Sequence, residues 1–555
     1  MVRVVAALAA LCVAIGSHAY VNPIIPGFNP DPTIIRTGKD YFLGTSSFEF
    51  YPGVPIYHST DLIKWTVVSH AYNRPSQLMM RGTAPSGGIY APTLRYHAQT
   101  QTYYCITTWF DIISPPDNVT RLPRSMYVHT KNMFDDNAWS DPVYVDQWGI
   151  DPDLFFDDDG KVYLSSAFGA DDFGHNNTGY FSIWTAQIDL TTGDALVPTQ
   201  FNLASGLPLD TPRLAEGPHI YKINGTYYLF TAEAGTAYIH REMAYRSTVG
   251  PYGPWEANPG NPLVFNGRNL SDSLLSTGHA DIVETPQGDW WAVFLGTRPQ
   301  NPANGSGLPQ LGRETFLAPL QWNDGWPSIN GGKDVTFEMP GLYDLVRPKL
   351  WKDTFSHAFV DKEYYTQRTP YKAFHSFPKS GGIDLRGNIY TLSDRETPAA
   401  FFRKQVAIST IFSAQVSFTP TTSLHEAGIT IFLSNEFHNE VGITIDPATN
   451  TTRLFASTRS GTNADLATVY ADLPAGGEKG VTLYIRAQAD KYDLGYGSVG
   501  GGEPTYIASV ESMWLQSYLP GWQNYVGAHF GFYSTGSGLP VLQKAHFAYV
   551  QTELV

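Results

Sequence analysis

Phe28-Asn29-Pro30-Asp31-Pro32-Thr33-Ile34-Ile35-Arg36 joins a rigid acidic turn to an apolar, strand-like run that continues to Leu43. Each proline ring fixes its own φ angle and restricts the residue before it, so the Asp31 carboxylate is held stiffly where the run begins. The polar segment Thr37-Gly38-Lys39-Asp40 interrupts the run, and two apolar runs around such a turn indicate a β-hairpin. The stretch therefore predicts an acid aimed from the mouth of a strand.

Four further segments within the first 340 residues share this arrangement of a short apolar run, a polar turn and a second apolar run. Together with the first, they begin at Asp31, Ala91, Asp151, Glu216 and His279. Repeats of about 60 residues, each built of several short strands, are typical of the blades of a β-propeller. The sequence therefore predicts a five-bladed β-propeller, and the lack of long helical periodicity disfavours a parallel α/β fold.

The innermost strands of a propeller surround a central channel, so we expect Asp31, Asp151, Glu216 and His279 to lie in one funnel. Taken singly, the aspartates fit turn or cap residues, and Glu216 fits a solvated loop acid. Their recurrence at one place in three repeats favours a shared site instead. Crowded carboxylates raise the pKa of at least one member. One protonated and one ionised acid at the same pH is what glycoside hydrolysis requires.

The repeat pattern ends near Pro340, which predicts a propeller domain over residues 20–341 and a linker over residues 342–350. Residues 351–555 again show short alternating apolar runs, for example at 409–418 and 427–433. About 200 residues of this pattern indicate a two-sheet β-sandwich. The rich content of Tyr, Phe and Trp, 33, 31 and 13 residues, suits an all-β protein.

Residues 1–19 have the basic start, apolar core and small-residue cleavage site of a signal peptide, so we expect a secreted, extracellular protein. A membrane anchor is the weaker alternative, because the apolar run is shorter than the roughly 20 residues that span a bilayer. Loss of Cys12 with the signal peptide leaves Cys105 alone, which excludes a disulfide framework and favours a buried, inert thiol. Six glycosylation sequons begin at Asn118, Asn176, Asn224, Asn269, Asn304 and Asn450.

The formal charge of −15 disfavours nucleic acid and anionic membranes as partners. An aromatic-rich, acidic chain is compatible with binding of a neutral sugar as substrate. No Gly-x-Ser-x-Gly motif, phosphate-binding glycine loop or His/Cys zinc spacing is present in the sequence. Hydrolysis by paired carboxylates remains the chemistry that the residues favour.

Several motifs, in order over roughly residues 22–340, resemble those of glycoside hydrolase family 43. They are Asn29-Pro-Asp-Pro, Ser47-Phe-Glu-Phe-Tyr-Pro-Gly53, Gly87-Gly-Ile-Tyr-Ala-Pro92, Asp151-Pro-Asp-Leu, Glu216-Gly-Pro-His-Ile-Tyr-Lys222, Gly278-His-Ala280 and Leu311-Gly-Arg-Glu-Thr315. The C-terminal region resembles, less sharply, the lectin-like sandwich of the xylosidase-type members, a concanavalin A-like jelly roll. The family has a five-bladed propeller, which agrees with the repeat count.

The resemblance implies a role for each residue at the predicted funnel. Asp31 matches the general base that activates water, and Glu216 matches the general acid that protonates the departing oxygen. Asp151 matches a third acid that orients Glu216 and tunes its pKa. Arg313 matches an arginine that donates hydrogen bonds to the sugar, with a surface arginine as the alternative. His279 matches an axial histidine that holds a water or calcium ion in some members, or is a satisfied core histidine; no other cofactor is implied.

The same resemblance suggests the walls of a sugar pocket. Phe48 and Tyr90 match aromatic wall residues, although many relatives carry tryptophan at the second position, and core packing is the alternative for both. Arg81 precedes the same loop and is expected near the entrance. In relatives with this sandwich, one of its loops closes the pocket with an aromatic residue. The candidates for that aromatic are Trp522, Phe530 and Phe532.

The function that the resemblance implies is inverting, exo-acting hydrolysis. The substrates are non-reducing-end α-L-arabinofuranosyl or β-D-xylosyl units of plant cell-wall arabinoxylan or xylo-oligosaccharides. The Tyr90 wall and the signal peptide favour the arabinofuranosidase, with a β-1,4-xylosidase as the alternative. A non-catalytic sugar-binding propeller is disfavoured because all three acids are present, and an endo-acting arabinanase because the sandwich tends to block one end of the groove. No nucleic acid, membrane or obligate protein partner is expected.

Overall fold

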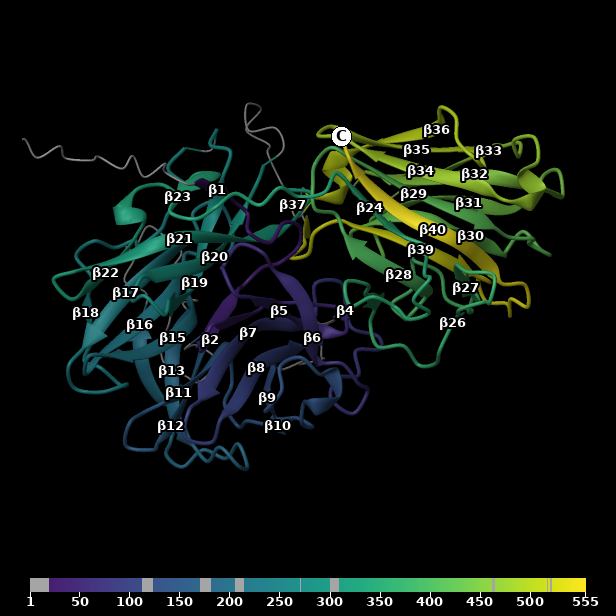
Figure 1. Ribbon diagram of the computed structural model, residues 1–555. Coiled ribbons are helices and arrows are strands. Elements are labelled where there is room, and N and C mark those ends of the chain that lie inside the picture. The colour runs from purple at the N-terminus through teal and green to yellow at the C-terminus, as the bar shows by residue number, and fades with distance from the viewer. Residues whose placement is uncertain are drawn as a thin grey trace, which may run out of the picture.

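The computed structural model describes residues 19–111, 123–169, 181–204, 214–269, 271–299, 309–461, 465–516, 518–519 and 522–555 (Figure 1). In this part of the chain the regular elements are β-strands and four short 3₁₀ turns, which confirms the all-β class. The turns are η1 (Asp136–Ala138), η4 (Asn330–Gly332), η5 (Gly477–Lys479) and η6 (Ser512–Leu515). No helix here is long and apolar enough to cross a membrane. Residues 1–18 and the sequons at Asn118, Asn176 and Asn304 lie outside the described residues.

Five four-stranded antiparallel sheets fill the N-terminal half of the described chain (Figure 1). The first contains β2 (Thr33–Thr37), β3 (Asp40–Gly44), β5 (Gly53–Ser59) and β6 (Thr66–Tyr72). The second contains β7 (Gly88–His97), β8 (Thr102–Phe110), β9 (Arg124–Thr130) and β10 (Val143–Tyr144), and the third β11 (Ile150–Phe156), β12 (Val162–Gly169), β13 (Phe181–Ile188) and β14 (Gln200–Ala204). The fourth contains β15 (Ala215–Ile223), β16 (Thr226–Glu233), β17 (Arg241–Ser247) and β18 (Glu256–Ala257), and the fifth β19 (Leu275–Glu284), β20 (Trp290–Thr297), β21 (Arg313–Asn323) and β22 (Trp326–Ile329).

The first strands of these sheets contact one another around a ring. β2 packs against β7, β7 against β11, and β11 against β15. The fourth sheet meets β19 through β16 and β17, and β19 returns to β2. Within each sheet the strands pair in chain order outward from the ring. This is the propeller-type architecture that the repeat predicts. Cys105, in β8, is fully buried, and burial raises the pKa of its thiol, as expected of an inert cysteine.

Every first strand is preceded or interrupted, at an equivalent position, by a residue with a left-handed backbone. These residues are Asp31 (φ 54°), Ala91 (φ 25°), Asp151 (φ 54°), Gly217 (φ 56°) and His279 (φ 53°). In β7, β11, β15 and β19 the strand register shifts at the same point. The sequence comparison had aligned Glu216 with the other starts, but the structure aligns Gly217, which takes a positive φ without strain. Glu216 is thus equivalent to Tyr90 and Ile150.

A buried polar network crosses the ring two to four residues further along these strands. Arg95 lies 2.6 Å from Asp153 Oδ1 and 3.3 Å from Asp281 Oδ2, and it also donates to His219 Nδ1 at 3.1 Å. Thr33 Oγ1 donates to Asp281 at 2.7 Å. One side chain from each of the five sheets therefore joins the network, and Arg95 is the cation that two buried carboxylates share.

Replacing Arg95 by Met is expected to lower the free energy of unfolding by about 3–5 kcal/mol, because it leaves buried charges without a partner. Denaturant unfolding followed by circular dichroism measures the loss. Arg36→Met is the matched control, since the Arg36 guanidinium also joins two sheets but binds the carbonyl of Glu284 at the surface. Equal losses in the two variants would contradict a special role for the buried ion pairs.

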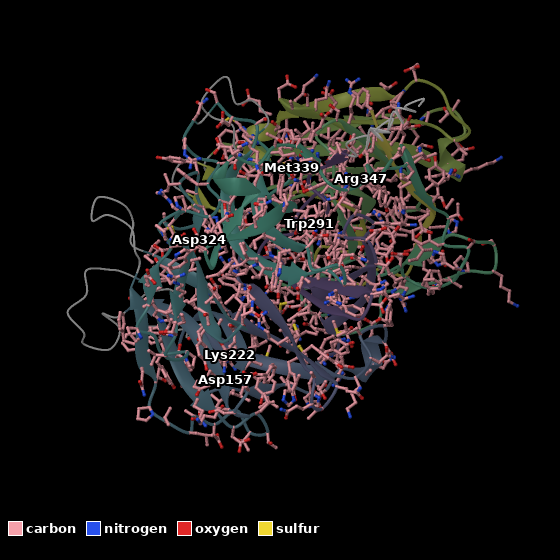
Figure 2. The ribbon with its side chains drawn as sticks, turned by 60° about the vertical axis from the view of Figure 1, so that its left-hand side comes forward. Asp157, Lys222, Trp291, Asp324, Met339 and Arg347 are labelled. Atoms are coloured by element: carbon pink, nitrogen blue, oxygen red, sulfur yellow. The ribbon has the colours of Figure 1, made fainter. Side chains whose placement is uncertain are left out.

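Polar and aromatic contacts also join neighbouring sheets at their outer parts. Figure 2 shows Lys222 beside Asp157, and Lys222 Nζ lies 2.7 Å from Asp157 Oδ1, which links β15 to the end of β11. The N-terminal strand β1 (Ala19–Val21) pairs with β23 (Glu338–Pro340). The ring of Tyr20 packs edge-on against Trp291 at 6.0 Å, so the start of the described chain is fastened to the fifth sheet.

The C-terminal half is a sandwich of two antiparallel sheets, in agreement with the expected concanavalin A-like domain (Figure 1). One sheet contains β24 (Leu350–Asp353), β26 (His375–Ser376), β27 (Ile383–Leu385), β29 (Thr410–Ser417), β34 (Val481–Ala487), β35 (Lys491–Ser498), β36 (Thr505–Glu511) and β40 (Ala545–Leu554). The other contains β28 (Ala399–Lys404), β30 (Glu426–Phe432), β31 (His438–Asp446), β32 (Thr451–Ser460), β33 (Asp465–Ala471) and β39 (His529–Thr535). The short strands β37 (Tyr518–Leu519) and β38 (Trp522–Gln523) pair with each other.

The sandwich is joined to the propeller-type domain by paired backbone and buried polar contacts. β4 (Phe50–Tyr51) pairs with β25 (Thr366–Gln367), which follows the linker. Arg368, fully buried, donates through its backbone N–H to the Glu49 carbonyl and through Nε to the Thr83 carbonyl. β24 begins at Leu350, one residue inside the segment predicted as linker. These contacts hold the two domains against each other beside the loop of residues 47–50.

Candidate active site

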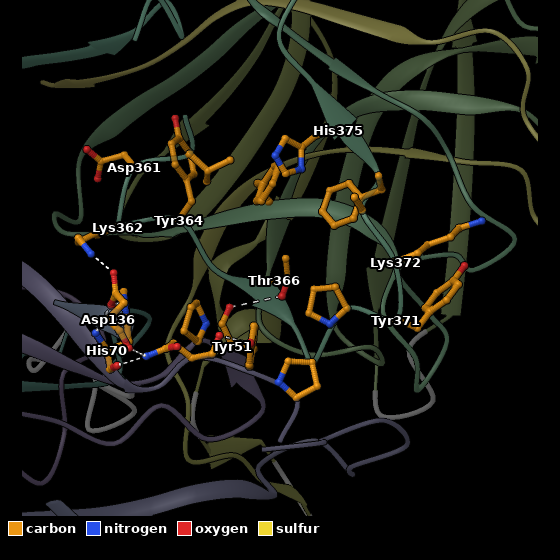
Figure 3. Close-up of a pocket in the computed structure, with 18 of the residues that line it drawn as sticks. Tyr51, His70, Asp136, Asp361, Lys362, Tyr364, Thr366, Tyr371, Lys372 and His375 are labelled. Carbon is orange, nitrogen blue, oxygen red and sulfur yellow. Dashed lines mark hydrogen bonds and ion pairs between the residues drawn. The ribbon is translucent and has the colours of Figure 1, made fainter. Parts of the chain in front are cut away.

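Two large cavities are candidates for the functional site. The first, a cleft of about 630 Å³ between the two domains, is lined by Tyr51, Tyr364 and their neighbours (Figure 3). Within this cleft, Lys362 forms an ion pair with Asp136. The Asp136 carboxylate also accepts a hydrogen bond from the His70 backbone N–H. The described lining of this cleft holds two carboxyl groups, those of Asp136 and Asp361, and none of the three acids that the sequence groups in one funnel.

The second cavity, of about 600 Å³, opens at the start of the ring of first strands. The sequence-predicted residues that line it are Asp31, Phe48, Tyr90, Asp151, Glu216, His279 and Arg313. Their neighbours in the wall are Phe110, Ile150, Phe181, Leu214, Ala234, Gly235, Thr236, Ala237, Ile239 and Tyr525. The structure therefore brings the three acids and the histidine into one funnel. Asp31 and Asp151 themselves have left-handed backbones, and such strained positions of non-glycine residues cluster at functional sites.

Asp31 is surrounded by donors. Ser46 Oγ donates to Asp31 Oδ2 at 2.5 Å, and Arg313 donates to Asp31 Oδ1 at 2.8 Å. His279 Nδ1 lies 3.7 Å from the same oxygen. Burial alone would raise the pKa of Asp31, but Arg313, His279 and Ser46 together outweigh it and hold the pKa below its usual value. Asp31 is thus ionised at neutral pH, as a base must be.

Glu216 and Asp151 have the opposite balance. Burial, followed by the negative charge of Asp31, raises the pKa of Glu216 to about 7. Burial and the neighbouring Glu216 and Asp31 raise the pKa of Asp151 well above its usual value. The Asp151 carboxylate accepts a hydrogen bond from the Gly217 backbone N–H at 3.2 Å. Asp151 therefore holds the peptide that carries Glu216, and Glu216 is protonated below neutral pH.

This balance predicts the pH dependence of kcat/KM. A general acid acts only while protonated, so activity should fall as the pH rises through about 7 and Glu216 loses its proton. On the acid side, activity should persist below the usual pKa of an aspartate, because that of Asp31 is lowered. Initial rates from about pH 3 to 9 test both limbs. A rate that keeps rising above pH 8 would contradict a protonated Glu216.

The walls of the funnel are aromatic. The rings of Phe48 and Tyr90 lie 4.7 Å apart, and the Tyr525 ring stacks on that of Phe48 at 6.1 Å and 18°. The Arg313 guanidinium lies 5.7 Å from the Phe48 ring and 6.0 Å from that of Tyr525. Arg313 is only 7% exposed, which rules out the surface-arginine alternative. The arginine thus stands between the base and the aromatic wall.

Some predicted wall residues lie elsewhere. Phe532 packs between Phe401 and Phe547 in the sandwich core, and Phe530 stacks on Phe412 at 4.9 Å, so neither reaches the funnel. Arg81 is not part of the described funnel lining; it is exposed and binds both carboxylate oxygens of Glu396 across the domain boundary. The side chain of Trp522 lies outside the described part of the chain.

Tyr525 and Ser46 are the most informative of the site residues that the sequence analysis missed. Tyr525 is the sandwich residue that lines the funnel, three residues beyond one candidate we named. Ser46 binds the base and also accepts the Ala91 backbone N–H at 2.7 Å. Ser46 stands directly before the Ser47–Gly53 motif, so its position was the available signal. No local pattern distinguished Tyr525 from the other aromatics of its segment.

The calcium ion that the resemblance allowed in the channel has a poor match here. The carboxylates next to His279 along the channel, Asp153 and Asp281, are both paired with Arg95, and Asp31 is paired with Arg313. Within the described ranges, no three His, Cys, Asp or Glu side chains are grouped to hold a metal ion. These residues do not fit a directly coordinated divalent cation.

A pocket that gathers an ionised and a protonated carboxyl group has the arrangement that glycoside hydrolysis requires. A family model described as Glycosyl hydrolases family 43 matches residues 20–327, and one described as Beta xylosidase C-terminal Concanavalin A-like domain matches residues 352–553. The chain belongs to glycoside hydrolase family 43.

Individual relatives cover nearly the whole chain. A non-reducing end alpha-L-arabinofuranosidase of Bacteroides ovatus is 35% identical over 543 residues, 96% of this chain and 95% of that protein. A solved Bacteroides ovatus chain described as Xyloglucan PUL GH43B superposes with a TM-score of 0.82 at 32% identity, over 97% of this chain and 100% of its own. A xylan beta-1,4-xylosidase from Bacillus halodurans gives a TM-score of 0.85 at 29% identity, over 96% and 100%.

Proposed function

We propose that the chain is an inverting, exo-acting glycosidase that removes single pentosyl units from the non-reducing ends of arabinoxylan or xylo-oligosaccharides. α-L-Arabinofuranosyl units are the favoured substrate, and β-D-xylosyl units are the second. The observation that carries the proposal is one funnel with an ionised Asp31 and a protonated Glu216. The arabinofuranosidase with 35% identity supports the first sugar, and the xylosidase structure supports the second.

In the proposed reaction, Glu216 gives its proton to the glycosidic oxygen as the bond to the anomeric carbon breaks. Asp31 takes a proton from a water molecule that attacks this carbon from the opposite face, which inverts its configuration. Asp151 holds the backbone beside Glu216 through the Gly217 N–H, and Arg313 keeps Asp31 ionised and oriented. The charge of Asp31 also favours the positive charge that develops on the sugar ring.

The architecture supports exo action. We propose that the five sheets are five blades of one closed propeller, because each sheet contacts the next around the ring and the fifth contacts the first. The funnel lies at one end of that ring and is lined on one side by Tyr525 of the sandwich. A pocket with a wall from the second domain accommodates a chain end better than the middle of a chain.

Product analysis tests the proposal directly. Proton NMR of the first-formed sugar should show the inverted anomer, and arabinose release from arabinoxylan should exceed xylose release from xylobiose. A retained anomer would overturn the roles of Asp31 and Glu216, and a xylose preference would make the chain mainly a β-1,4-xylosidase. A non-catalytic sugar-binding propeller requires that neither sugar be released by the intact chain.

We further propose that the protein is secreted after loss of residues 1–19 and glycosylated, with a catalytic domain over residues 20–341 and no obligate protein partner. The apolar segment 4–15 supports secretion. Among the sequons in the described residues, Asn224, Asn269 and Asn450 are all exposed, as an attached glycan requires. N-terminal sequencing and mass analysis of the secreted protein test these statements.

We also propose that catalysis needs no metal ion, because Arg95 supplies the positive charge within the channel. Dialysis against EDTA should leave both the activity and the melting temperature unchanged, since removing a ligand lowers the melting temperature only if the native state binds it. The measurement is the initial rate and the thermal unfolding curve before and after dialysis. A loss that added calcium restores would overturn the proposal.

A further inference from the structure

Ser86 is a polar residue of the interior that the proposed reaction does not use. It lies just before β7, is 2% exposed, and has a left-handed backbone with φ of 60°. A buried serine adopts this conformation at a cost in free energy, so its surroundings hold it there. Those surroundings are the funnel wall on one side and the sandwich on the other.

All the polar groups of Ser86 are engaged. Its carbonyl accepts the Tyr90 hydroxyl at 2.5 Å, and its backbone N–H donates to Glu49 Oε2 at 3.2 Å. Its hydroxyl donates to Asn524 Oδ1 and accepts the Tyr525 backbone N–H at 2.9 Å. One serine therefore contacts both tyrosines of the funnel, one from each domain.

The segment that carries Tyr525 is fixed to the propeller-type domain at two points. Ser86 holds its beginning, and the Ala528 backbone N–H donates to the Gln310 carbonyl at 2.8 Å near its end. At the second point Gly527 packs so closely on Gly312 that a Cβ on Gly312 would lie 2.9 Å from the Gly527 Cα. Loss of the Ser86 hydroxyl therefore releases one end only, and the segment stays attached beside Arg313.

We propose that Ser86 is a positioning residue that sets the width of the sugar pocket between Tyr90 and Tyr525, and so determines which pentosyl ring is accepted. The inference rests on the proposed function of the funnel. Tyr525 is stacked on Phe48, and the Tyr90 ring also packs against that of Phe48 at 4.7 Å, so the three rings form one wall. Ser86 fixes the spacing of this wall without touching the reacting atoms.

The test compares Ser86→Ala with the wild type on an arabinofuranoside and a xyloside. Loss of one hydrogen-bonded anchor should raise KM about three- to tenfold while kcat changes little, because the acid and base are untouched. The ratio of kcat/KM for the two substrates should change as well. Ser86→Gly also removes the hydroxyl but relieves the left-handed backbone, so it should give the same kinetic change in a chain that folds at least as well.

Thr369→Val is the matched control. The Thr369 hydroxyl also crosses the domain boundary with two partners, because it donates to the Leu78 carbonyl at 2.9 Å and accepts the Met80 N–H at 3.0 Å, but it is not part of the funnel wall. This variant should lose comparable stability and keep its KM and its sugar preference. Asn524→Ala removes the partner of the Ser86 hydroxyl and should reproduce the KM increase, without adding to that of Ser86→Ala.

Three outcomes would overturn the inference. They are an unchanged KM in folded Ser86→Gly, the same kinetic change in Thr369→Val as in Ser86→Ala, and fully additive effects of the Ser86 and Asn524 variants. Failure of the proposed function looks different, because the wild type itself would then release neither arabinose nor xylose. An active wild type with a KM that ignores Ser86 defeats the positioning role alone.

Discussion

Glu216→Gln is expected to lower kcat on arabinoxylan fragments by about 10²- to 10⁴-fold, the usual contribution of a general acid. Gln has the size of the protonated acid but cannot release a proton to the glycosidic oxygen. The loss should be far smaller on a nitrophenyl glycoside, whose leaving group needs little protonation. The measurement is kcat on both substrates, with calorimetric binding of the oligosaccharide showing that the pocket is intact.

Stability supplies an independent check on Glu216. Its folded pKa of about 7 lies above the usual 4.5, so its contribution to stability is complete at low pH and is lost as the pH rises through about 7. Glu216→Gln should therefore melt higher than the wild type above neutral pH. Glu242→Gln is the control: this carboxyl is fully buried with a raised pKa, accepts the Ala280 N–H, and is not part of the funnel wall. An inactive Glu242→Gln with an active Glu216→Gln would contradict the assignment.

The sequence was sufficient for the architecture because a propeller repeats one unit. Equivalent positions in successive repeats meet at the axis, so Asp31, Asp151 and His279 could be grouped from their spacing alone. Comparison of the repeats placed Glu216 one position out of register. It treated the acid as the residue equivalent to Asp31, whereas the structure shows that Gly217 beside it is the equivalent residue. The side chain still reaches the funnel, since the equivalent Tyr90 and Ile150 line the same cavity.

The parts that could not be predicted depend on the packing of two domains. Phe530 and Phe532 stand two residues apart on β39, so their side chains share one face of the sheet, which is the sandwich core. Tyr525 lies before that strand, in the segment that Ser86 holds against the funnel. Arg81 was placed at the entrance because its loop is, but Glu396 of the other domain binds it. Such partners are hundreds of residues away in sequence.

The ring carries two layers of charged residues with different roles: an upper tier that lines the funnel, and a lower tier further along the same strands. The upper tier, with Asp31 and Asp151, has left-handed backbones and carboxyl groups whose pKa values are driven apart. In the lower tier the carboxylates of Asp153 and Asp281 share the cation of Arg95. The strain at the upper tier is thus held by a network that ties all five sheets together. Substitutions at the two tiers should therefore differ in kind, the upper affecting turnover and the lower affecting unfolding.

Asp31→Asn is the second variant with a very large expected effect, a fall in kcat of about 10²- to 10⁴-fold, because an amide cannot take a proton from water. Unlike Glu216→Gln, it should be equally damaging on a nitrophenyl glycoside, since attack by water remains necessary whatever the leaving group. It should also move the basic limb of the residual activity to lower pH. The negative charge of Asp31 raises the pKa of Glu216 and Arg313 lowers it, so removing the aspartate leaves the arginine unopposed.

Asp153→Asn is the control that separates the pH shift expected of Asp31→Asn from general damage to the ring of strands. Asp153 is buried in β11 and paired with Arg95 at 2.6 Å, two residues from Asp151, so its loss should lower the melting temperature and leave the pH profile in place. Azide should restore part of the turnover of Asp31→Ala, because this anion attacks the sugar without a base. A glycosyl azide of inverted configuration would fix Asp31 on the face opposite Glu216. If Asp31→Asn turned over substrate nearly as fast as the wild type, Asp31 would not be the general base.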